Sequence, residues 1–193
     1  NQISGDWAGY AQESIQRRHP GTIALVSAGC GADSNPVRSQ KPQDEVASIH
    51  GREIGTKVTL LLQQKLRPLS GPLNVMFSTV DLHLAPLPSR AEWERRAQRD
   101  SDRGGTVGFH ARVHLNRLDR GEPLKTKVPL PVQTWRFGNS LAIVFLGGEV
   151  VADYSLRLKK ELDAERVWIN SYANDVPCYI PSERVLREGG YEG

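Results

Sequence analysis

Two short apolar runs separated by a helix-length segment constrain the fold of this chain more than any other feature. Residues 141–146 (LAIVFL) and 167–170 (VWIN) have the composition of buried strands, and residues 151–164 between them have the pattern of a helix. In a strand-helix-strand unit the two strands are parallel and the crossover is right-handed, so both following loops emerge at one edge of the sheet. We therefore expect an α/β protein with its site at the carboxyl ends of the strands.

The rest of the chain adds strands and helices to this unit. Strands are predicted at residues 22–27, 73–84 and 128–137, and the prolines at 129 and 131 place the last of these at a sheet edge or at a strand start. Helices are predicted from a cap at Ser4 or Asp6 to His19, from Asp44 to Pro68, from Ser89 to about residue 99, and around residues 107–118. We see no linker or repeat, so residues 1–193 are expected to form part of a single domain with a mixed sheet flanked by helices.

The composition is that of a globular protein and argues against several classes. Hydrophobic residues make up 38% of the chain and charged residues 24%. The net charge is only +3 and no basic block is interleaved with aromatic residues, so we expect no nucleic-acid partner. No apolar run approaches the roughly 18 residues of a membrane span. Cys30 and Cys178 are too few for a disulfide framework and leave the redox compartment open.

Three of the predicted strands lead into loops with polar or reactive side chains. The loops are residues 29–36 (GCGADSNP), 147–149 (GGE) and 172–179 (YANDVPCY). If all three strands are parallel, one sheet edge brings together Asp33, Ser34, Glu149, Tyr172, Asp175 and Tyr179. A carboxylate and a phenolate can bind Zn²⁺, usually together with histidines. This edge is therefore a candidate zinc site.

Four segments in and around these loops follow one another in a distinctive order. They are residues 131–133 (PVQ), 141–149 (LAIVFLGGE), 174–181 (NDVPCYIP) and 191–192 (YE). Together they resemble the neutral ceramidase family, whose members hydrolyse the amide bond of ceramide with a zinc ion in the active site. The resemblance covers most of the chain from residue 29 onward and is most specific after residue 131.

The resemblance implies metal-binding roles for two residues. Glu149 falls on the zinc-binding glutamate at the end of the family's Gly-Glu strand. Tyr179 falls on a tyrosine that is a zinc ligand, although Ile-Pro follows it here in place of Ile-Thr-Thr. The family's two zinc-binding histidines lie upstream of the serine loop, so we expect them, with the rest of the catalytic domain, in sequence that precedes this chain.

The resemblance also implies catalytic and substrate-binding residues. Tyr191 falls on an active-site tyrosine, and Ser34 falls on the family serine in a loop where the order of the neighbouring residues differs. Asp33 and Tyr172 are expected to contact the substrate. In such a site Zn²⁺ lowers the pKa of a bound water and polarises the scissile carbonyl. The implied substrate is a lipid-like N-acyl compound, with a membrane surface as a possible contact and a secreted or periplasmic location.

Two alternatives remain open. The first is a related hydrolase of a different, soluble N-acyl compound, which would not need the long apolar groove that acyl chains require. The second is a non-catalytic binding module that has kept the scaffold and lost the metal. Absence of the two upstream histidines from the complete protein would favour the second alternative.

A pair of histidines lies outside these loops. His110 and His114 are four residues apart on a predicted helix, so both can face one side of it. The glutamate that follows the first histidine in zinc-peptidase helices is absent, since Ala111 takes its place. We expect His110 and His114 to be surface or half-buried residues.

Overall fold

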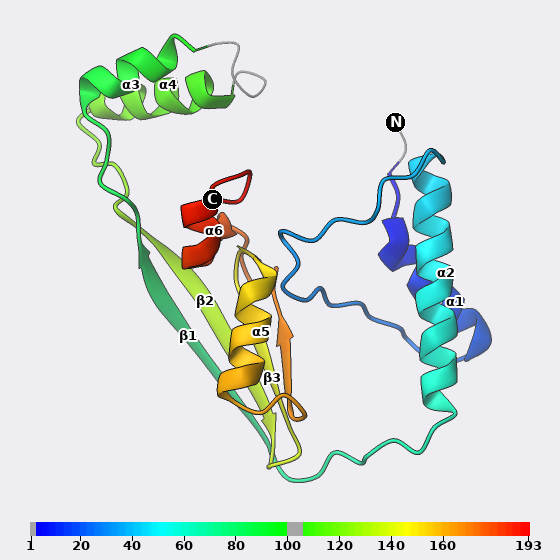
Figure 1. Ribbon diagram of the computed structural model, residues 1–193. Coiled ribbons are helices and arrows are strands. Elements are labelled where there is room, and N and C mark those ends of the chain that lie inside the picture. Colours follow the sequence, from blue (N-terminus) through cyan, green and yellow to red (C-terminus); the bar gives the residue numbers. More distant parts are fainter. Residues whose placement is uncertain (1–2, 100–105) are drawn as a thin grey trace. The chain divides into compact units, whose positions relative to one another are not determined.

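The computed structural model of the chain describes residues 3–99 and 106–193 (Figure 1). The helices are α1 (Asp6–Arg18), α2 (Gln43–Leu62), α3 (Arg90–Ala97), α4 (Thr106–Asp119), α5 (Ala152–Glu161) and α6 (Glu183–Glu188). The strands are β1 (Leu73–His83), β2 (Lys127–Phe137), β3 (Leu141–Leu146), β4 (Glu149–Val150), β5 (Val167–Asn170) and β6 (Tyr179–Ile180). The predicted α/β class is confirmed. Within the described residues, no helix is long and apolar enough to cross a membrane.

Four strands form a mixed sheet in the order β1-β2-β3-β5. Strands β2 and β3 are antiparallel from Val132↔Leu146 to Phe137↔Leu141 and are joined by the predicted hairpin turn. Strands β3 and β5 are parallel. Helix α5 connects them and contacts β5 (Figure 1). The strand-helix-strand unit predicted from the sequence is therefore present.

The prediction of a buried strand at residues 22–27 is wrong. These residues have no regular secondary structure, and the side chains of Ile23 and Leu25 are 82% and 85% exposed. A strand needs a neighbour to satisfy its backbone groups, and no strand pairs with this segment in the described part of the chain. Side chains hold it instead: Gln12 Nε2 donates to Ala24 O and Ala24 N–H donates to Gln16 Oε1, both at 3.1 Å. At its end the Ser27 hydroxyl donates to Asn170 Oδ1 at 2.8 Å, and Ser171 N–H donates to the carbonyl of Ala28 at 3.0 Å.

The prolines of β2 lie near its start, as predicted, but β2 is not an edge strand. It lies between β1 and β3. The ladder with β3 begins at Val132, directly after Pro131. The two residues that lack an N–H group therefore precede the segment paired with β3 and cost that ladder no hydrogen bond.

Helices α1 and α2 pack against each other through small side chains. Ala47, Gly51 and Gly55 of α2 are buried, whereas the larger apolar side chains of Ile54 and Leu61 are exposed. A Cβ atom at Gly51 would lie 2.5 Å from the carbonyl oxygen of Trp7. The close approach of the helices therefore depends on glycine and not on the large apolar side chains of α2. The N-cap residue of α1 is Gly5 and not Ser4 or Asp6, although the Ser4 hydroxyl accepts from Asp6 N–H (3.1 Å) and the Asp6 carboxylate accepts from Trp7 N–H (2.6 Å).

We expect Gly51→Ala to destabilise the contact between α1 and α2, because the added methyl group meets backbone atoms that cannot rotate away. The expected loss is about 1–3 kcal/mol of unfolding free energy, measured by chemical denaturation. Gly9→Ala in α1 is the matched control, since nothing lies within 4 Å of its added Cβ. That change should stabilise the helix by roughly 0.5–1 kcal/mol. Equal effects of the two substitutions would contradict the packing described.

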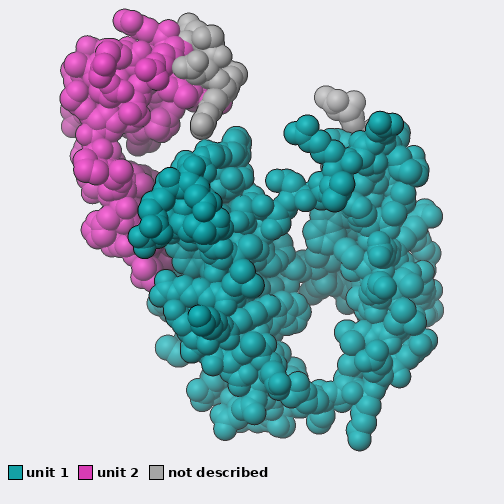
Figure 2. Space-filling model, in the orientation of Figure 1, with its two compact units in different colours: residues 1–78, 131–193 teal, residues 79–130 magenta. Residues whose placement is uncertain are grey.

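The chain divides into two compact units, one formed by Asn1–Ser78 with Pro131–Gly193 and the other by Thr79–Leu130 (Figure 2). In the second unit, α3 and α4 pack around Trp93, whose side chain is 3% exposed. The Ser89 hydroxyl caps α3 by accepting from Glu92 N–H at 3.3 Å, as predicted. His110 is exposed and His114 half-buried, also as predicted. Burial lowers the pKa of His114, and His110 and Arg117 lower it further.

Candidate functional site

Glu149 and Tyr179 are direct partners on two short parallel strands. Strands β4 and β6 pair in the register Glu149↔Tyr179 and Val150↔Ile180. Backbone hydrogen bonds from Glu149 N–H to Cys178 O (3.0 Å) and from Val151 N–H to Ile180 O (3.3 Å) hold the pair together. Because Glu149 and Tyr179 are register partners, their side chains project from the same face of the β4–β6 pair. The two residues predicted as zinc ligands therefore lie side by side.

The two loops that carry these residues are joined by backbone hydrogen bonds. Tyr172 N–H donates to Gly148 O at 3.1 Å, and Ala173 N–H donates to Leu146 O at 3.1 Å. In the other direction, Gly148 N–H donates to Asp175 O at 2.8 Å. The loops after β3 and β5 thus run together beyond the sheet, as the strand-helix-strand topology requires.

Gly148 is required by both its conformation and its surroundings. Its φ of +75° lies in the left-handed region that glycine adopts most easily. A Cβ atom at this position would also lie 2.6 Å from Cγ1 of Ile180, one residue beyond Tyr179. The Gly147-Gly148 pair before Glu149 therefore allows the loop after β5 to approach β4.

Tyr191 packs against Tyr179. Their ring centroids are 5.6 Å apart and the rings meet edge to face. Tyr191 follows α6 and is 71% exposed, so its phenol is open to a ligand. Burial raises the pKa of Tyr179, and nearby Glu149 raises it further, with smaller effects from Tyr191 and Glu192. A bound metal cation would act in the opposite direction and favour the phenolate.

Tyr172 lies in the loop before β6, whereas Tyr191 follows β6 in the chain. Its φ is +57°, an uncommon value for a residue with a side chain. Burial raises the pKa of Tyr172, and Glu149, Cys30 and Asp33 add smaller effects in the same direction. The structure therefore brings Tyr172 into the electrostatic environment of both Glu149 and Asp33.

Asp33 has a structural partner. Its Oδ1 accepts a hydrogen bond from Ala152 N–H at 2.8 Å, at the first turn of α5. Helix α5 has no side-chain cap at its N-cap residue, Val151. Ala32 N–H adds a bond to Val150 O at 3.2 Å. The loop at residues 29–36 is thus fixed beside β4, and Asp33 satisfies a helix-end donor, an interaction typically worth about 1 kcal/mol.

Ser34 lies in the same loop but is not drawn into the cluster. Its N–H closes a turn onto Gly31 O at 3.0 Å, and its side chain is exposed. Within the residues that the structure describes, the Ser34 hydroxyl makes no hydrogen bond. The structure therefore brings Glu149, Tyr179, Tyr191 and Tyr172 together and places Asp33 next to them, whereas no hydrogen bond among the described residues links Ser34 to this group.

The pair offers two oxygen atoms of kinds that can ligate a zinc ion. Among residues 3–99 and 106–193, no three His, Cys, Asp or Glu side chains are placed to hold a metal ion. Protein zinc sites usually have four ligands, three or four of them from the protein. The adjacent carboxylate and phenol oxygens fit such a site as a partial ligand set.

Sequence reasoning missed Asp153, which ties α5 to α6. Its Oδ2 accepts from Ser182 Oγ (2.6 Å) and Arg184 Nε (3.0 Å), and its Oδ1 accepts from Arg184 Nη2 (3.0 Å). Arg184 lowers the pKa of Asp153, with a smaller contribution from Ser182. Ser182 also caps α6 by accepting from Val185 N–H. The cap pattern at Ser182 was the available sequence signal, and this network positions the helix that leads to Tyr191.

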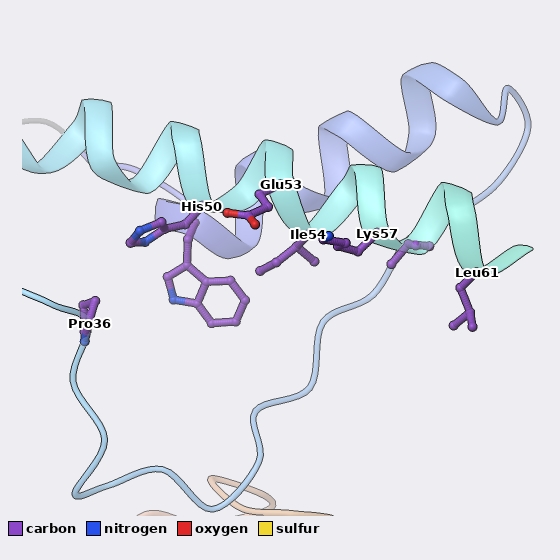
Figure 3. A pocket seen from close by; sticks show the side chains of 8 residues that line it. Pro36, His50, Glu53, Ile54, Lys57 and Leu61 are labelled. Carbon is purple, nitrogen blue, oxygen red and sulfur yellow. The ribbon is translucent and has the colours of Figure 1, made fainter.

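An apolar groove lies on α1 and α2 and is bordered by Pro36 of the loop at residues 29–36. It has a volume of about 600 Å³ and is lined by Trp7, Pro36, His50, Glu53, Ile54, Lys57, Val58 and Leu61 (Figure 3). Pro36 lies two residues after Ser34. None of the predicted site residues lines this groove.

Comparison with known proteins adds no assignment. No protein family matches the chain in sequence, and none of the curated proteins is significantly similar to it. The site is therefore interpreted from its own geometry.

We expect Gly148→Ala to disrupt the β4–β6 pair, because the new methyl group is strained at positive φ and collides with Ile180. The combined cost should be roughly 2–4 kcal/mol of unfolding free energy. Gly121→Ala is the control, since Gly121 has a similar φ of +70° and nothing within 4 Å of an added Cβ. It should cost only about 1–2 kcal/mol. Thermal unfolding measures both, and indistinguishable losses would contradict the collision.

The Asp153–Arg184 contact predicts an acid-sensitive link between α5 and α6. Because the folded-state pKa of Asp153 is lowered, its stabilisation is complete above the unfolded pKa of about 3.9 and is lost as the pH falls through the folded value. Amide exchange of α6 should therefore accelerate below about pH 4. Asp153→Asn should accelerate exchange at neutral pH and weaken this pH dependence. Exchange that is equally slow in the two proteins at neutral pH would argue against the link.

Proposed function

We propose that this chain carries part of the active site of a zinc-dependent amidohydrolase that resembles neutral ceramidase. The observation that carries the proposal is the direct pairing of Glu149 with Tyr179 on the parallel strands β4 and β6. These two residues were predicted as metal ligands from separate motifs 30 positions apart in the sequence. Their adjacency is what a shared ligand role requires.

In the proposed site, Glu149 and Tyr179 hold the metal together with two histidines from upstream sequence. Bound zinc would supply a Lewis acid that polarises the scissile carbonyl and lowers the pKa of water. Tyr191 lies at contact distance from Tyr179 and has an exposed phenol, which can donate a hydrogen bond to charge that develops on the substrate. Tyr172 and Asp33 border the same space, with Asp33 also fixing the loop. The exposed hydroxyl of Ser34 is left to contact the substrate.

The proposed substrate is a lipid-like N-acyl compound. The proposed location of the protein is secreted or periplasmic. Support comes from the apolar groove that begins near the Ser34 loop, since an acyl chain needs such a surface. Many large apolar side chains of the described residues are also exposed, including Phe77, Leu61 and Met76. Exposed apolar surface of this kind is typical of regions that bind other protein or lipid. We propose that the rest of the catalytic domain covers part of this exposed apolar surface.

The test uses the complete protein with Glu149→Ala and Tyr179→Phe. Zinc content is measured by elemental analysis, and hydrolysis is measured on a long-chain N-acyl sphingoid base and on a short, soluble N-acyl amine. We expect both substitutions to reduce zinc content, and Glu149→Ala to lower activity by roughly 100-fold or more. Asp175→Asn is the control, because Asp175 lies in the same loop and its carboxylate accepts only from Val176 N–H among the described residues.

The outcomes separate the proposals. Full metal content and activity in Glu149→Ala would rule out the zinc-ligand role. Hydrolysis of the short, soluble N-acyl amine alone would support the related hydrolase with a different substrate. A wild-type protein that neither binds zinc nor hydrolyses either compound would favour the binding module that has lost the metal.

A further inference from the structure

The second unit holds two imidazoles that point at each other. His110 and His114 are one turn apart on α4, and their Nε2 atoms are 2.9 Å apart. Their ring centroids are 4.3 Å apart and the ring planes are nearly perpendicular. Two ligand nitrogens bound to one metal at about 2.0–2.1 Å lie roughly 2.9–3.4 Å from each other. The two Nε2 atoms are hydrogen-bonded to each other in the free protein. Their separation equals that of two neighbouring positions around one metal ion, so a bound ion would replace the proton shared between them.

Trp93 of α3 holds both imidazoles in place. Its ring centroid lies 4.6 Å from that of His114 and 5.8 Å from that of His110. The guanidinium of Arg96 lies 5.4 Å from the Trp93 ring centroid. Because Trp93 is almost fully buried, it cannot move without opening the contact between α3 and α4. The imidazoles are thus fixed by packing before any ligand arrives, which reduces the entropy cost of binding.

Only one ring nitrogen of His114 is placed to bind a ligand. Its Nδ1 is buried and has no hydrogen-bond partner among the described residues. The remaining ring nitrogen, Nε2, is the one that faces His110. His110 is itself exposed, so the space beside the two Nε2 atoms is open to solvent.

We propose that His110 and His114 form a binding site for a divalent first-row transition metal ion. Imidazole nitrogen suits Cu²⁺, Ni²⁺ and Zn²⁺, whereas Mg²⁺ and Ca²⁺ require oxygen ligands. The described residues offer no third His, Cys, Asp or Glu ligand at this place, so water completes the coordination. The neighbouring guanidinium of Arg117 opposes a bound cation, so the affinity is moderate. A bound ion links two turns of α4 and stabilises the α3–α4 hairpin.

The experiment titrates the purified full chain with CuCl₂, NiCl₂, ZnCl₂ and MgCl₂, followed by calorimetry and tryptophan fluorescence. We expect one ion per chain, with Cu²⁺ bound more tightly than Ni²⁺ or Zn²⁺ and no response to Mg²⁺. Cu²⁺ should quench the fluorescence of Trp93, and this quenching should be absent in Trp93→Phe. His110→Gln should weaken binding on the order of 100-fold, because the second imidazole no longer acts in the same complex.

Two controls make the result specific. His83→Gln changes an exposed histidine of the same unit and should leave binding unchanged. Glu149→Gln should also leave it unchanged, because that residue belongs to the zinc site proposed above. Circular dichroism checks that His110→Gln is folded, which is expected for an exposed residue.

Equal affinity of the wild-type chain and folded His110→Gln for Cu²⁺ would overturn the proposal. Loss of the same binding in Glu149→Gln would overturn it as well, since the ion would then lie at the other site. Binding that depends on His110 and not on Glu149 would support the two-imidazole site, whether or not the complete protein hydrolyses an amide.

Discussion

The parallel pairing of β4 with β6 is the interaction on which the candidate site depends. Each strand has only two residues, and so short a pair is not stable by itself. It persists because it continues the direction set by β3 and β5, which are parallel in the main sheet. The N–H groups of Tyr172 and Ala173, between β5 and β6, donate to Gly148 O and Leu146 O, between β3 and β4 or at the end of β3. These bonds keep the two chain segments side by side as they leave the main sheet. The position of Glu149 beside Tyr179 is therefore a consequence of sheet topology.

Much of the fold was predictable because the sequence pattern is local. The strands at residues 141–146 and 167–170, the hairpin between β2 and β3, and the Ser89 cap are all specified by nearby residues. The segment at residues 22–27 has an equally apolar pattern but forms no strand, because a strand also depends on a neighbour that offers backbone groups. Composition alone cannot identify that neighbour.

The same limit applied to packing and to the site. The apolar pattern of α2 predicted a helix but not its contact with α1, which is made by Ala47, Gly51 and Gly55, residues that carry little hydrophobic signal. At the site, the topology rule brought the loops of Glu149 and Tyr179 together correctly. The Asp153–Arg184 contact and the exposed position of Ser34 could not be predicted, because they depend on how loops and helix ends meet in three dimensions.

The hydrogen bond from Ala152 to Asp33 has a consequence for how this protein can vary. It joins a surface loop to a helix that begins 119 residues later, and that helix makes the crossover between the parallel strands. Surface loops usually tolerate insertions and deletions. Here a change in loop length would withdraw the carboxylate from the helix end and weaken the crossover. The length of this loop is therefore constrained by the fold. New ligand preferences can arise in the loop by substitution more easily than by insertion.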